Sequence, residues 1–505
     1  MFPYLTVSIL LPILGGLVVL LLPKERSGLI RWTSLIVALL NLVLVVVISL
    51  LYAQINTSSY LSTYALEENL HLSTGIGVNY HLSVDGVSIL LILLTALLTV
   101  VCIGASFKVE RKLKNYMAFM LLLESGILGV FMAANLFLFY IFWELMLIPA
   151  YFLVGSWGGE RRIYAAFKFV LYTSVGSLLM LAGIIALGYY HQIAAGGAYT
   201  LDLADLLNTR LDSTLQLWLF AAFGLAFAIK VPLIPFHSWL PDAYSEAPAP
   251  VTAMLAGAMS KTGAYAFLRF CIPLFPQAAQ MLAPALSILA LIGILYCALL
   301  ALVQTDLKRL LGYSSISHLG VVMLALFAFN LQSVEGSVMQ MVNHGITTAA
   351  LFLIAGFIEA KTGTRRLSDF GGLAFRVPVL ATIMAIAALS SLGLPGLNSF
   401  AGEFMALLGI FNGNMVFGIL ATAVVVPAAW YMLRFFQGIM QGPRQQGGLV
   451  GASLRRGVLF DVHVHEFLSL APLLALIFIL GLLPQPLIFL MERSLLTVMQ
   501  VVGVK

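Results

Sequence analysis

The stretch Leu217-Trp-Leu-Phe-Ala-Ala-Phe-Gly-Leu-Ala-Phe-Ala-Ile-Lys230 places a lysine at the end of a long apolar segment, and Pro232 and Pro235 follow directly. A lysine inside a membrane span is costly, so it is normally kept only where it lines a polar path or has a partner. Each proline removes a backbone donor and interrupts the helix. Interrupted helices at membrane depth are tolerated where they are buried or line a cavity, and ion-coupling sites are built in this way. The stretch therefore predicts a membrane protein with a polar path at Lys230.

The composition of the chain agrees with a bilayer location. Of the 505 residues, 61% are hydrophobic and only 9% are charged, whereas soluble domains carry about 25% charged residues. Cys102, Cys271 and Cys297 lie in apolar runs and are fewer than the four thiolates of an iron–sulfur cluster. The chain has no GxGxxG or P-loop pattern, and its basic residues lie in short loops between apolar segments. We therefore expect no cofactor or metal in this chain and no nucleic-acid partner.

Apolar stretches of roughly 20 residues predict membrane helices. The predicted fold class is an all-α polytopic membrane protein with fourteen spans, at about 4–22, 30–52, 86–107, 115–134, 136–157, 163–190, 214–240, 249–271, 281–304, 309–330, 336–358, 377–411, 414–440 and 466–491. The first span lacks a basic n-region and is predicted to be retained rather than cleaved as a signal peptide. The seventh and twelfth are too long for one straight span, and both contain prolines.

The loops between the spans predict an orientation. Most basic residues fall on one side: Lys24, Arg26, Arg31, Lys108, Arg111, Lys112, Lys114, Arg161, Arg162, Lys168, Lys308, Arg309, Lys361, Arg365, Arg366, Arg376, Arg434, Arg444, Arg455 and Arg456. Arg210, Arg269, Arg493 and Lys505 fall on the other side, and Lys230 and Lys261 lie within spans. By the positive-inside tendency, both termini face outward, as an even number of spans requires.

The spacing of the charged positions suggests an internal duplication. Lys230 and Glu403 are 173 residues apart, and Glu144 and His318 are 174 apart. We therefore expect an N-terminal three-helix segment (1–114), two five-helix repeats (115–271, helices four to eight, and 272–440, helices nine to thirteen) and a C-terminal helix (441–505). Because five is odd, the second repeat must be inserted upside down. Inverted repeats with paired broken helices are typical of transporters.

Glu144 and Lys261 are ionisable residues near the middle of predicted spans. Glu144 lies about nine residues into its span, and its charge makes it the natural partner of Lys230. The plainer interpretation is a helix-packing carboxylate. Lys261 lies among small residues in Gly257-Ala-Met-Ser-Lys-Thr-Gly263, which let neighbouring helices approach closely. Because it is far from a helix end, it does not fit a snorkelling lysine and is a candidate for a proton relay.

Two histidines and a second carboxylate extend this candidate path. His318 and His344 lie near the middle of the tenth and eleventh spans, and together they form a plausible bridge from the lysines to Glu403. The alternative is that each histidine is a hydrogen-bonded polar group of the core. Glu403 follows the break Leu394-Pro-Gly-Leu-Asn398, where a carboxylate could also cap the restarted half-helix.

Glu124 and His237 are further candidates. Glu124, in the fourth span, fits relay and packing equally well. His237, with Asp242 and Glu246, flanks the end of the seventh span, where a solvated turn is an equally good interpretation.

Four motifs in these regions resemble one known family. They are Ile229-Lys-Val-Pro-Leu-Ile-Pro-Phe-His-Ser-Trp-Leu-Pro-Asp-Ala-Tyr-Ser-Glu-Ala-Pro248, Phe142-Trp-Glu-Leu-Met-Leu-Ile-Pro149, Tyr313-Ser-Ser-Ile-Ser-His318 and Leu394-Pro-Gly-Leu-Asn-Ser-Phe-Ala-Gly-Glu403. The first resembles the signature of the antiporter-like subunits of respiratory complex I. The others resemble its chain M, the fourth mitochondrial-type subunit, or the counterpart in the photosynthetic NDH complex. The resemblance covers nearly the whole chain.

Two features distinguish the M-type chain from its sisters L and N. The sister chains usually have lysine where this sequence has Glu403, and chain L adds a long lateral helix, whereas this sequence stops about fourteen residues after the last predicted span.

The resemblance implies that Glu144, Lys230, Lys261, His344 and Glu403 form a proton path with His318 beside it. It also implies that iron–sulfur clusters, quinone and FMN, where present, are held by partner subunits, among them sister antiporter-like chains.

The resulting hypothesis is a proton-translocating, non-redox subunit of an NAD(P)H- or ferredoxin-quinone oxidoreductase in a bacterial plasma membrane or a thylakoid. Separation of Glu144 from Lys230 would release a proton to Lys261 and then, through His318 or His344, to Glu403. The nearest alternative is a subunit of a multi-subunit Na⁺/H⁺ antiporter or of a membrane-bound hydrogenase. A non-transporting scaffold has no reason to bear the cost of several buried charges, and for a quinone-binding redox subunit the sequence offers no distinctive site.

Overall fold

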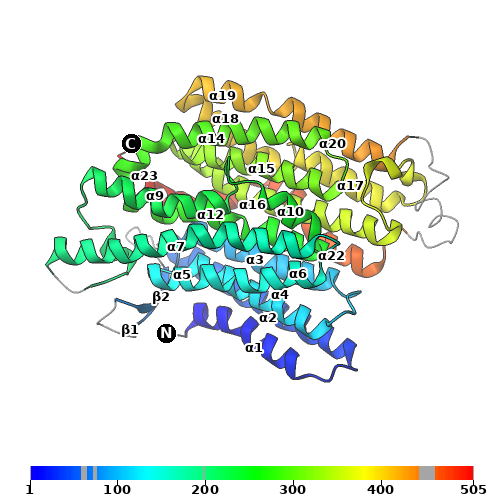
Figure 1. Ribbon diagram of the computed structural model, residues 1–505, viewed down its shortest axis with the longest axis horizontal. Coiled ribbons are helices and arrows are strands. Elements are labelled where there is room, and N and C mark those ends of the chain that lie inside the picture. The colour runs from blue at the N-terminus through cyan, green and yellow to red at the C-terminus, as the bar shows by residue number, and fades with distance from the viewer. Residues whose placement is uncertain (1, 59–64, 72–76, 197–198, 443–460, 504–505) are drawn as a thin grey trace.

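The apolar segments fold as long helices that run side by side through the molecule (Figure 1). A helix satisfies its own backbone donors and acceptors, which is what a chain in a bilayer requires. The structure is a computed structural model, and it describes residues 2–58, 65–71, 77–196, 199–442 and 461–503. The predicted all-α membrane class is confirmed.

The helices of the first half end at the break after Lys230. They are α1 (Tyr4–Leu21), α2 (Ser27–Ser58), α3 (Gly86–Ala105), α4 (Leu113–Met132), α5 (Leu136–Leu145), α6 (Leu147–Trp157), α7 (Arg162–Ala195), α8 (Leu203–Leu206) and α9 (Ser213–Lys230).

The middle of the chain contains the helices α10 (Trp239–Glu246), α11 (Ala249–Met254), η1 (Leu255–Met259), α12 (Lys261–Ala266), η2 (Phe267–Cys271), α13 (Ile272–Leu274), α14 (Pro276–Val303), α15 (Leu307–Leu326) and α16 (Leu331–Thr362). The remainder comprises η3 (Leu367–Asp369), η4 (Leu373–Phe375), α17 (Pro378–Ser391), α18 (Asn398–Gly413), α19 (Met415–Thr422), α20 (Val425–Met440), α22 (Val464–Leu482) and α23 (Gln485–Val501).

The predicted spans agree with these helices in number. In the part of the chain that the structure describes, 12 helices are long and apolar enough to cross a membrane. The other two predicted spans are segmented: 249–271 is a run of α and π turns, and 377–411 is divided into α17 and α18. The expected breaks in the seventh and twelfth spans are confirmed, because α9 stops at Lys230 and α17 at Ser391.

The predicted last span, 466–491, is wrong in its boundary. Helix α22 ends at Leu482, and a separate helix, α23, begins at Gln485. Proline cannot continue the hydrogen-bond ladder of a helix, and Pro484 stands at the junction. Helix α23 packs against α3 and α16, and the backbone N–H of Gly86 at the start of α3 donates to Ser494 Oγ at 2.9 Å. The chain therefore contains an additional helix beyond its last span.

A β-hairpin was not predicted. Strands β1 (Ala65–His71) and β2 (Asn79–Val84) pair antiparallel. The side chain of His81 lies between Glu67, at 2.6 Å, and Asp202, at 3.4 Å. Burial alone would lower the pKa of His81, but the hydrogen bond and charge of Asp202, with those of Glu67, raise it above its ordinary value. This cluster ties the hairpin to the segment before α8.

Both termini lie at the same end of the molecule, opposite the loop between α1 and α2 (Figure 1). This arrangement agrees with an even number of spans. Of the basic residues assigned to the loop side, Arg444, Arg455 and Arg456 lie outside the described residues.

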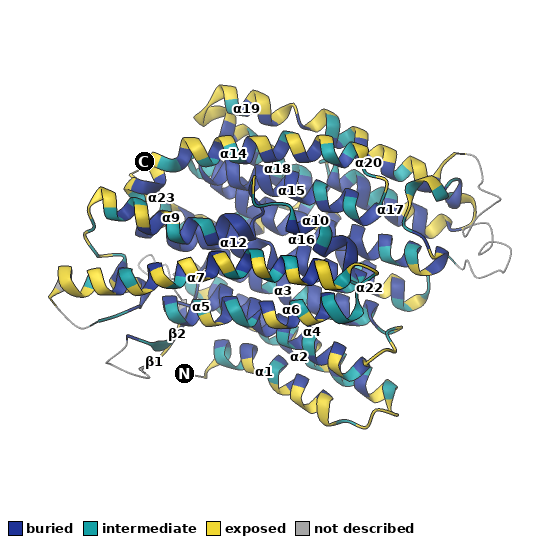
Figure 2. Cartoon of the chain, viewed as in Figure 1, coloured by how far each residue is buried: buried dark blue, intermediate teal, exposed yellow. Residues whose placement is uncertain are grey.

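The core of the bundle is centred on α16. Within its membrane-spanning window, 94% of the residues are buried, whereas the corresponding share for α2 is 28%. Figure 2 shows the same contrast between dark central helices and exposed outer faces. The three cysteines are buried and unpaired. The polar residues of α16 are therefore enclosed by protein rather than by lipid.

Candidate functional site

Lys230 is buried at the end of α9, and its ammonium group faces aromatic rings. Its side chain is 1% exposed, and Nζ lies 5.3 Å from the centroid of the Trp143 ring and 5.6 Å from that of Phe169. Aromatic faces attract a cation at such distances. Among the described residues, Nζ has no hydrogen-bond partner.

The break after Lys230 is held by residues of α10. The N–H of Leu233 bonds to the carbonyl of Ala228, so the carbonyl of Ile229 loses its usual helical partner. The indole N–H of Trp239 donates to that carbonyl at 2.9 Å. The Trp239 ring in turn packs on Phe169, with ring centroids 5.0 Å apart. Trp239, in the motif that follows Lys230, therefore caps the end of α9 and packs on Phe169, one of the rings around the lysine.

The predicted ion pair between Glu144 and Lys230 is not formed in this structure. Glu144 is half-buried at the end of α5, and its Oε1 has no partner among the described residues. Successive residues of a helix point about 100° apart, so α5 presents the Trp143 ring to Lys230 and Glu144 points in another direction. Trp143, the residue before Glu144, therefore takes the place beside Lys230 that the prediction gave to the carboxylate.

Lys261 follows a π-helical turn. In η1 the N–H of Ser260 bonds to the carbonyl of Leu255, five residues back, which frees the carbonyl of Ala256. That carbonyl accepts from Ser260 Oγ and from Lys261 Nζ. Single π turns recur at functional sites because they expose backbone acceptors. A second π turn, η2, follows α12.

Lys261 contacts His344 directly, as the predicted bridge requires. Lys261 is 0% exposed, and its Nζ lies 2.8 Å from His344 Nδ1 on α16. The contact is possible because the helices meet backbone to backbone beside it. A Cβ at Gly345 would lie 2.7 Å from the carbonyl oxygen of Gly257, so Gly345 tolerates no side chain.

His318 and Glu403 form the second half of the row. His318 Nδ1 lies 2.5 Å from Glu403 Oε1, and Gln340 Nε2 donates to the same oxygen at 2.9 Å. The rings of His318 and His344 have centroids 5.6 Å apart. Among the described residues, the Nε2 atoms of both rings have no partner. The four groups Lys261, His344, His318 and Glu403 thus form a row of ionisable groups across the core.

The break before Glu403 is fixed by an asparagine pair. Asn343 Nδ2 donates to the carbonyl of Asn398 at 2.7 Å, and Asn398 Nδ2 donates to the carbonyl of Asn343 at 3.2 Å. Ser390 Oγ donates to Asn398 Oδ1 at 2.6 Å. Gly393, with a φ of +71°, allows Glu403 to approach the break, since a Cβ there would lie 3.1 Å from Oε2.

The asparagine pair and Gln340 were missed by the sequence reasoning, which considered only ionisable residues. The signal that could have found Asn343 is its position directly before His344.

The further candidates lie apart from this row. Glu124 is fully buried, and its Oε1 accepts from Asn41 Nδ2 of α2 at 2.8 Å. This contact joins α2 to α4 and favours the packing role. The ring of His237 lies 5.9 Å from that of Tyr296, and no described contact joins it to Lys230 or Lys261. The structure therefore does not bring these two residues into the row.

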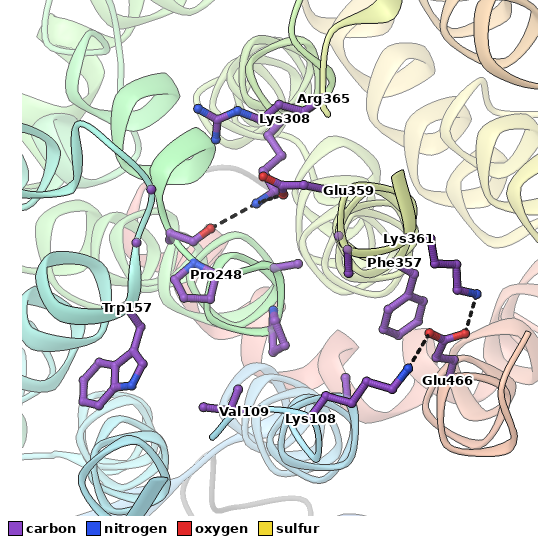
Figure 3. Close-up of a pocket in the computed structure, with 18 of the residues that line it drawn as sticks. Lys108, Val109, Trp157, Pro248, Lys308, Phe357, Glu359, Lys361, Arg365 and Glu466 are labelled. Atoms are coloured by element: carbon purple, nitrogen blue, oxygen red, sulfur yellow. Dashed lines mark hydrogen bonds and ion pairs between the residues drawn. The ribbon is translucent and has the colours of Figure 1, made fainter. Parts of the chain in front are cut away.

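A polar cavity of about 510 Å³ opens on the side that carries the basic loops. Its walls hold ion pairs between Lys308 and Glu359, at 2.6 Å, and between Lys361 and Glu466, at 2.7 Å (Figure 3). Pro248, at the start of the segment that leads to Lys261, also lines it. The cavity brings water-accessible charges to the end of the helix run that carries Lys261.

The comparisons with known proteins agree with this geometry. Residues 133–427 match the family model described as NADH:quinone oxidoreductase/Mrp antiporter, TM. The chain belongs to this family. Subunit M of NADH-quinone oxidoreductase from Rickettsia bellii is 39% identical over 486 residues, covering 95% of each chain. The subunit M from Escherichia coli is 37% identical over 493 residues, covering 95% of this chain and 94% of that one. The motifs predicted an antiporter-like subunit of the M type, and this prediction is confirmed.

Solved structures show that the whole fold is shared within this antiporter-like family. A chain of respiratory complex I from Thermus thermophilus superposes with a TM-score of 0.87 at 31% identity, covering 99% of this chain and 100% of that one. A chain of the Mrp complex from Dietzia has a TM-score of 0.84 at 22% identity, covering 99% and 100%. At that identity, the second likeness concerns the fold alone.

Proposed function

We propose that this antiporter-like chain carries protons across the membrane as a non-redox subunit of an NADH-quinone oxidoreductase. The observation that carries the proposal is the row Lys261–His344–His318–Glu403, with contacts of 2.8 Å at one end and 2.5 Å at the other. Burying such groups is expensive, so they are normally kept only for function. The names of the relatives support NADH as the electron donor. We place donor binding, the iron–sulfur clusters, FMN and quinone in partner subunits, including sister antiporter-like chains.

The first step of the proposed cycle uses Glu144 as a switch. An ion pair at about 4 Å is worth on the order of 4 kcal/mol at an effective dielectric constant of 20. Moving one charge against a membrane potential costs about 2.3 kcal/mol per 100 mV. The two energies are comparable, so making and breaking the Glu144–Lys230 pair can gate one proton. The present structure, with Lys230 unpartnered, fits the separated state of that cycle.

The later steps follow the row of contacts. Lys261 passes its proton to His344 Nδ1, His344 and His318 exchange it through their unpartnered Nε2 atoms, and His318 delivers it to Glu403. The separation of the histidine rings is within reach of a transfer through one water molecule. The histidines therefore act in series, whereas the sequence left open which of the two is used.

The sidedness of the path follows from the loops. We propose that the polar cavity supplies protons from the side of the basic loops and that both termini face the opposite side, by the positive-inside tendency. We also propose that 115–271 and 272–440 are inverted repeats, which is supported by one broken helix in each. A bacterial plasma membrane fits the bacterial relatives, and a thylakoid is the alternative.

The test uses the intact complex in sealed membrane vesicles. Lys230→Ala and Glu144→Ala should sharply reduce proton pumping driven by NADH while the complex still assembles. Lys24→Gln, an exposed lysine on a loop, is the matched control and should pump normally. Full pumping in both Ala variants would exclude the proposed path.

A second candidate is a subunit of a Na⁺/H⁺ antiporter, because the family description that matches this chain also names the Mrp antiporter. A Na⁺ gradient imposed on the same vesicles without NADH distinguishes the two. Proton movement driven by Na⁺ alone would favour the antiporter, whereas movement that requires electron transfer favours the oxidoreductase.

A further inference from the structure

An apolar groove runs along α3 on the outside of the bundle, between α2 and α22. Both of these helices pack on α3. Residues at helical spacing line the groove: Trp32, Leu35, Leu39, Leu42 and Val46 on α2, and His465, Leu468, Pro472, Leu476 and Leu480 on α22. Each stripe spans about 21–23 Å at a rise of about 1.5 Å per residue.

The groove has two hollow sections. The section nearer the basic loops has a volume of about 510 Å³, and Gly104 lies on its floor. The section nearer the opposite side has a volume of about 350 Å³ and is lined only by leucine, valine and isoleucine. Both volumes lie in the range of small-molecule sites, about 300–1,000 Å³.

The end of the groove at the basic loops carries aromatic and cationic groups. Trp32 is 58% exposed there and packs edge-on against Phe107, with ring centroids 5.6 Å apart. Tryptophan is enriched at the level of lipid headgroups. The next residue after Phe107 is Lys108, whose ammonium points toward Glu466, the neighbour of the groove residue His465 (Figure 3). Arg31, which donates to the carbonyl of Val109 at 3.2 Å, adds a second cation.

The charge of Lys108 is not fully engaged by protein. Its ammonium lies 3.8 Å from Glu466 Oε1, and its side chain is 60% exposed. Glu466 already has a closer partner in Lys361, at 2.7 Å. An exposed pair at such a distance contributes little, so Lys108 is free to meet an anion.

We propose that this groove binds an anionic phospholipid of the leaflet on the basic-loop side. Its acyl chain lies over Gly104 between α2 and α22, and its phosphate meets Lys108 and Arg31. The cytoplasmic leaflet is the anionic one and attracts basic residues next to spans. A partner helix is the alternative occupant, but the charged groups at this end of the groove, Lys108 and Arg31, are both cations and match a phosphate. Lys108 also lines the polar cavity that we propose as the proton supply, so the test measures lipid retention rather than pumping.

The test counts the lipids that stay with the whole complex. Complexes are purified in mild detergent, reconstituted into phosphatidylcholine vesicles doped with phosphatidylglycerol, extracted again, and analysed for retained lipid by mass spectrometry. Gly104→Leu fills the groove without striking backbone, since a Cβ there meets Ser469 Oγ at 3.2 Å and nothing else within 4 Å. Gly438→Leu is its matched control, because that exposed glycine of α20 has open space around it. Lys108→Gln and Lys24→Gln form the second pair.

The wild-type complex should retain one phosphatidylglycerol more than the Gly104→Leu complex, and Gly438→Leu should match the wild type. Lys108→Gln should reduce the preference for phosphatidylglycerol over phosphatidylcholine about fivefold, and Lys24→Gln should leave it unchanged. Equal retention in wild type and Gly104→Leu would overturn the proposal. Loss of a neighbouring subunit from Gly104→Leu, with lipid retention unchanged, would overturn it in favour of a protein occupant.

Discussion

Replacing His318 by leucine removes the link between the two halves of the row while keeping an apolar side chain of similar size. In the protein, His318 lies 2.5 Å from Glu403 on one side and faces the His344 ring, at 5.6 Å between centroids, on the other. Without its ring, His344 and Glu403 are left beyond hydrogen-bond reach, which is about 2.6–3.2 Å. A positioned acid–base group typically contributes about 10²–10⁴-fold to a proton transfer. We therefore expect proton flux through this chain to fall at least about a hundredfold.

The assay is NADH-driven acidification or alkalinisation of sealed vesicles that contain the purified complex, followed with a pH-sensitive dye. His191→Leu is the control: it removes a half-buried histidine that bonds Thr209 at 2.6 Å, far along the chain from the row. His318→Gln separates two roles, because glutamine can still bond Glu403 but cannot carry a proton. Unchanged flux in His318→Leu, or wild-type flux in His318→Gln, would show that His318 does not carry the proton between His344 and Glu403.

Three further predictions concern packing, pH and Glu124. Gly336→Val should lower the thermal transition temperature of the complex, because a Cβ there would lie 2.2 Å from the N atom of Ala406 and overpacking typically costs about 1–3 kcal/mol. Gly438→Val should leave this temperature unchanged. Equal transition temperatures in the two variants would contradict the close contact between α16 and α18. The contact of β2 with Asp202, followed by hydrogen exchange of the strand, should weaken as pH rises through the raised pKa of His81. A group whose pKa is raised in the folded state contributes stability below that pKa and loses it above. His81→Gln should abolish this pH dependence, and its persistence would point to another group. Glu124→Gln should leave pumping within about twofold of wild type, because a neutral amide can keep the contact with Asn41; loss of pumping would return Glu124 to the path.

The sequence was sufficient to predict the helical class, the spans and both breaks, because each depends on local composition. Length and apolarity define a span, and prolines and glycines mark where it stops. The end of α22 was placed nine residues too late because the apolar signal continues past Pro484 into α23. The hairpin was missed because β1 is a short polar strand, Ala-Leu-Glu-Glu-Asn-Leu-His, that only pairing across the chain defines.

The candidate residues could be predicted because burying an ionisable side chain in a membrane span is energetically costly. Their contact partners could not be predicted in this way. A buried charge is visible in the sequence, so Lys261, His344, His318 and Glu403 were found. The pair of Glu144 with Lys230 is not formed in this structure, in which the Trp143 ring faces Lys230. The asparagine pair at Asn343 and Asn398 depends on contact between distant helices, which no local pattern records.

The central claim is that protons pass through Lys261 to the histidines. The most direct test is the number of protons moved per electron in vesicles containing the complex with Lys261→Met, compared with wild type at matched rates of NADH oxidation. Methionine fills the same buried space but carries no proton. We expect a lower ratio of protons to electrons in the variant, and an unchanged ratio would contradict the passage of protons through Lys261.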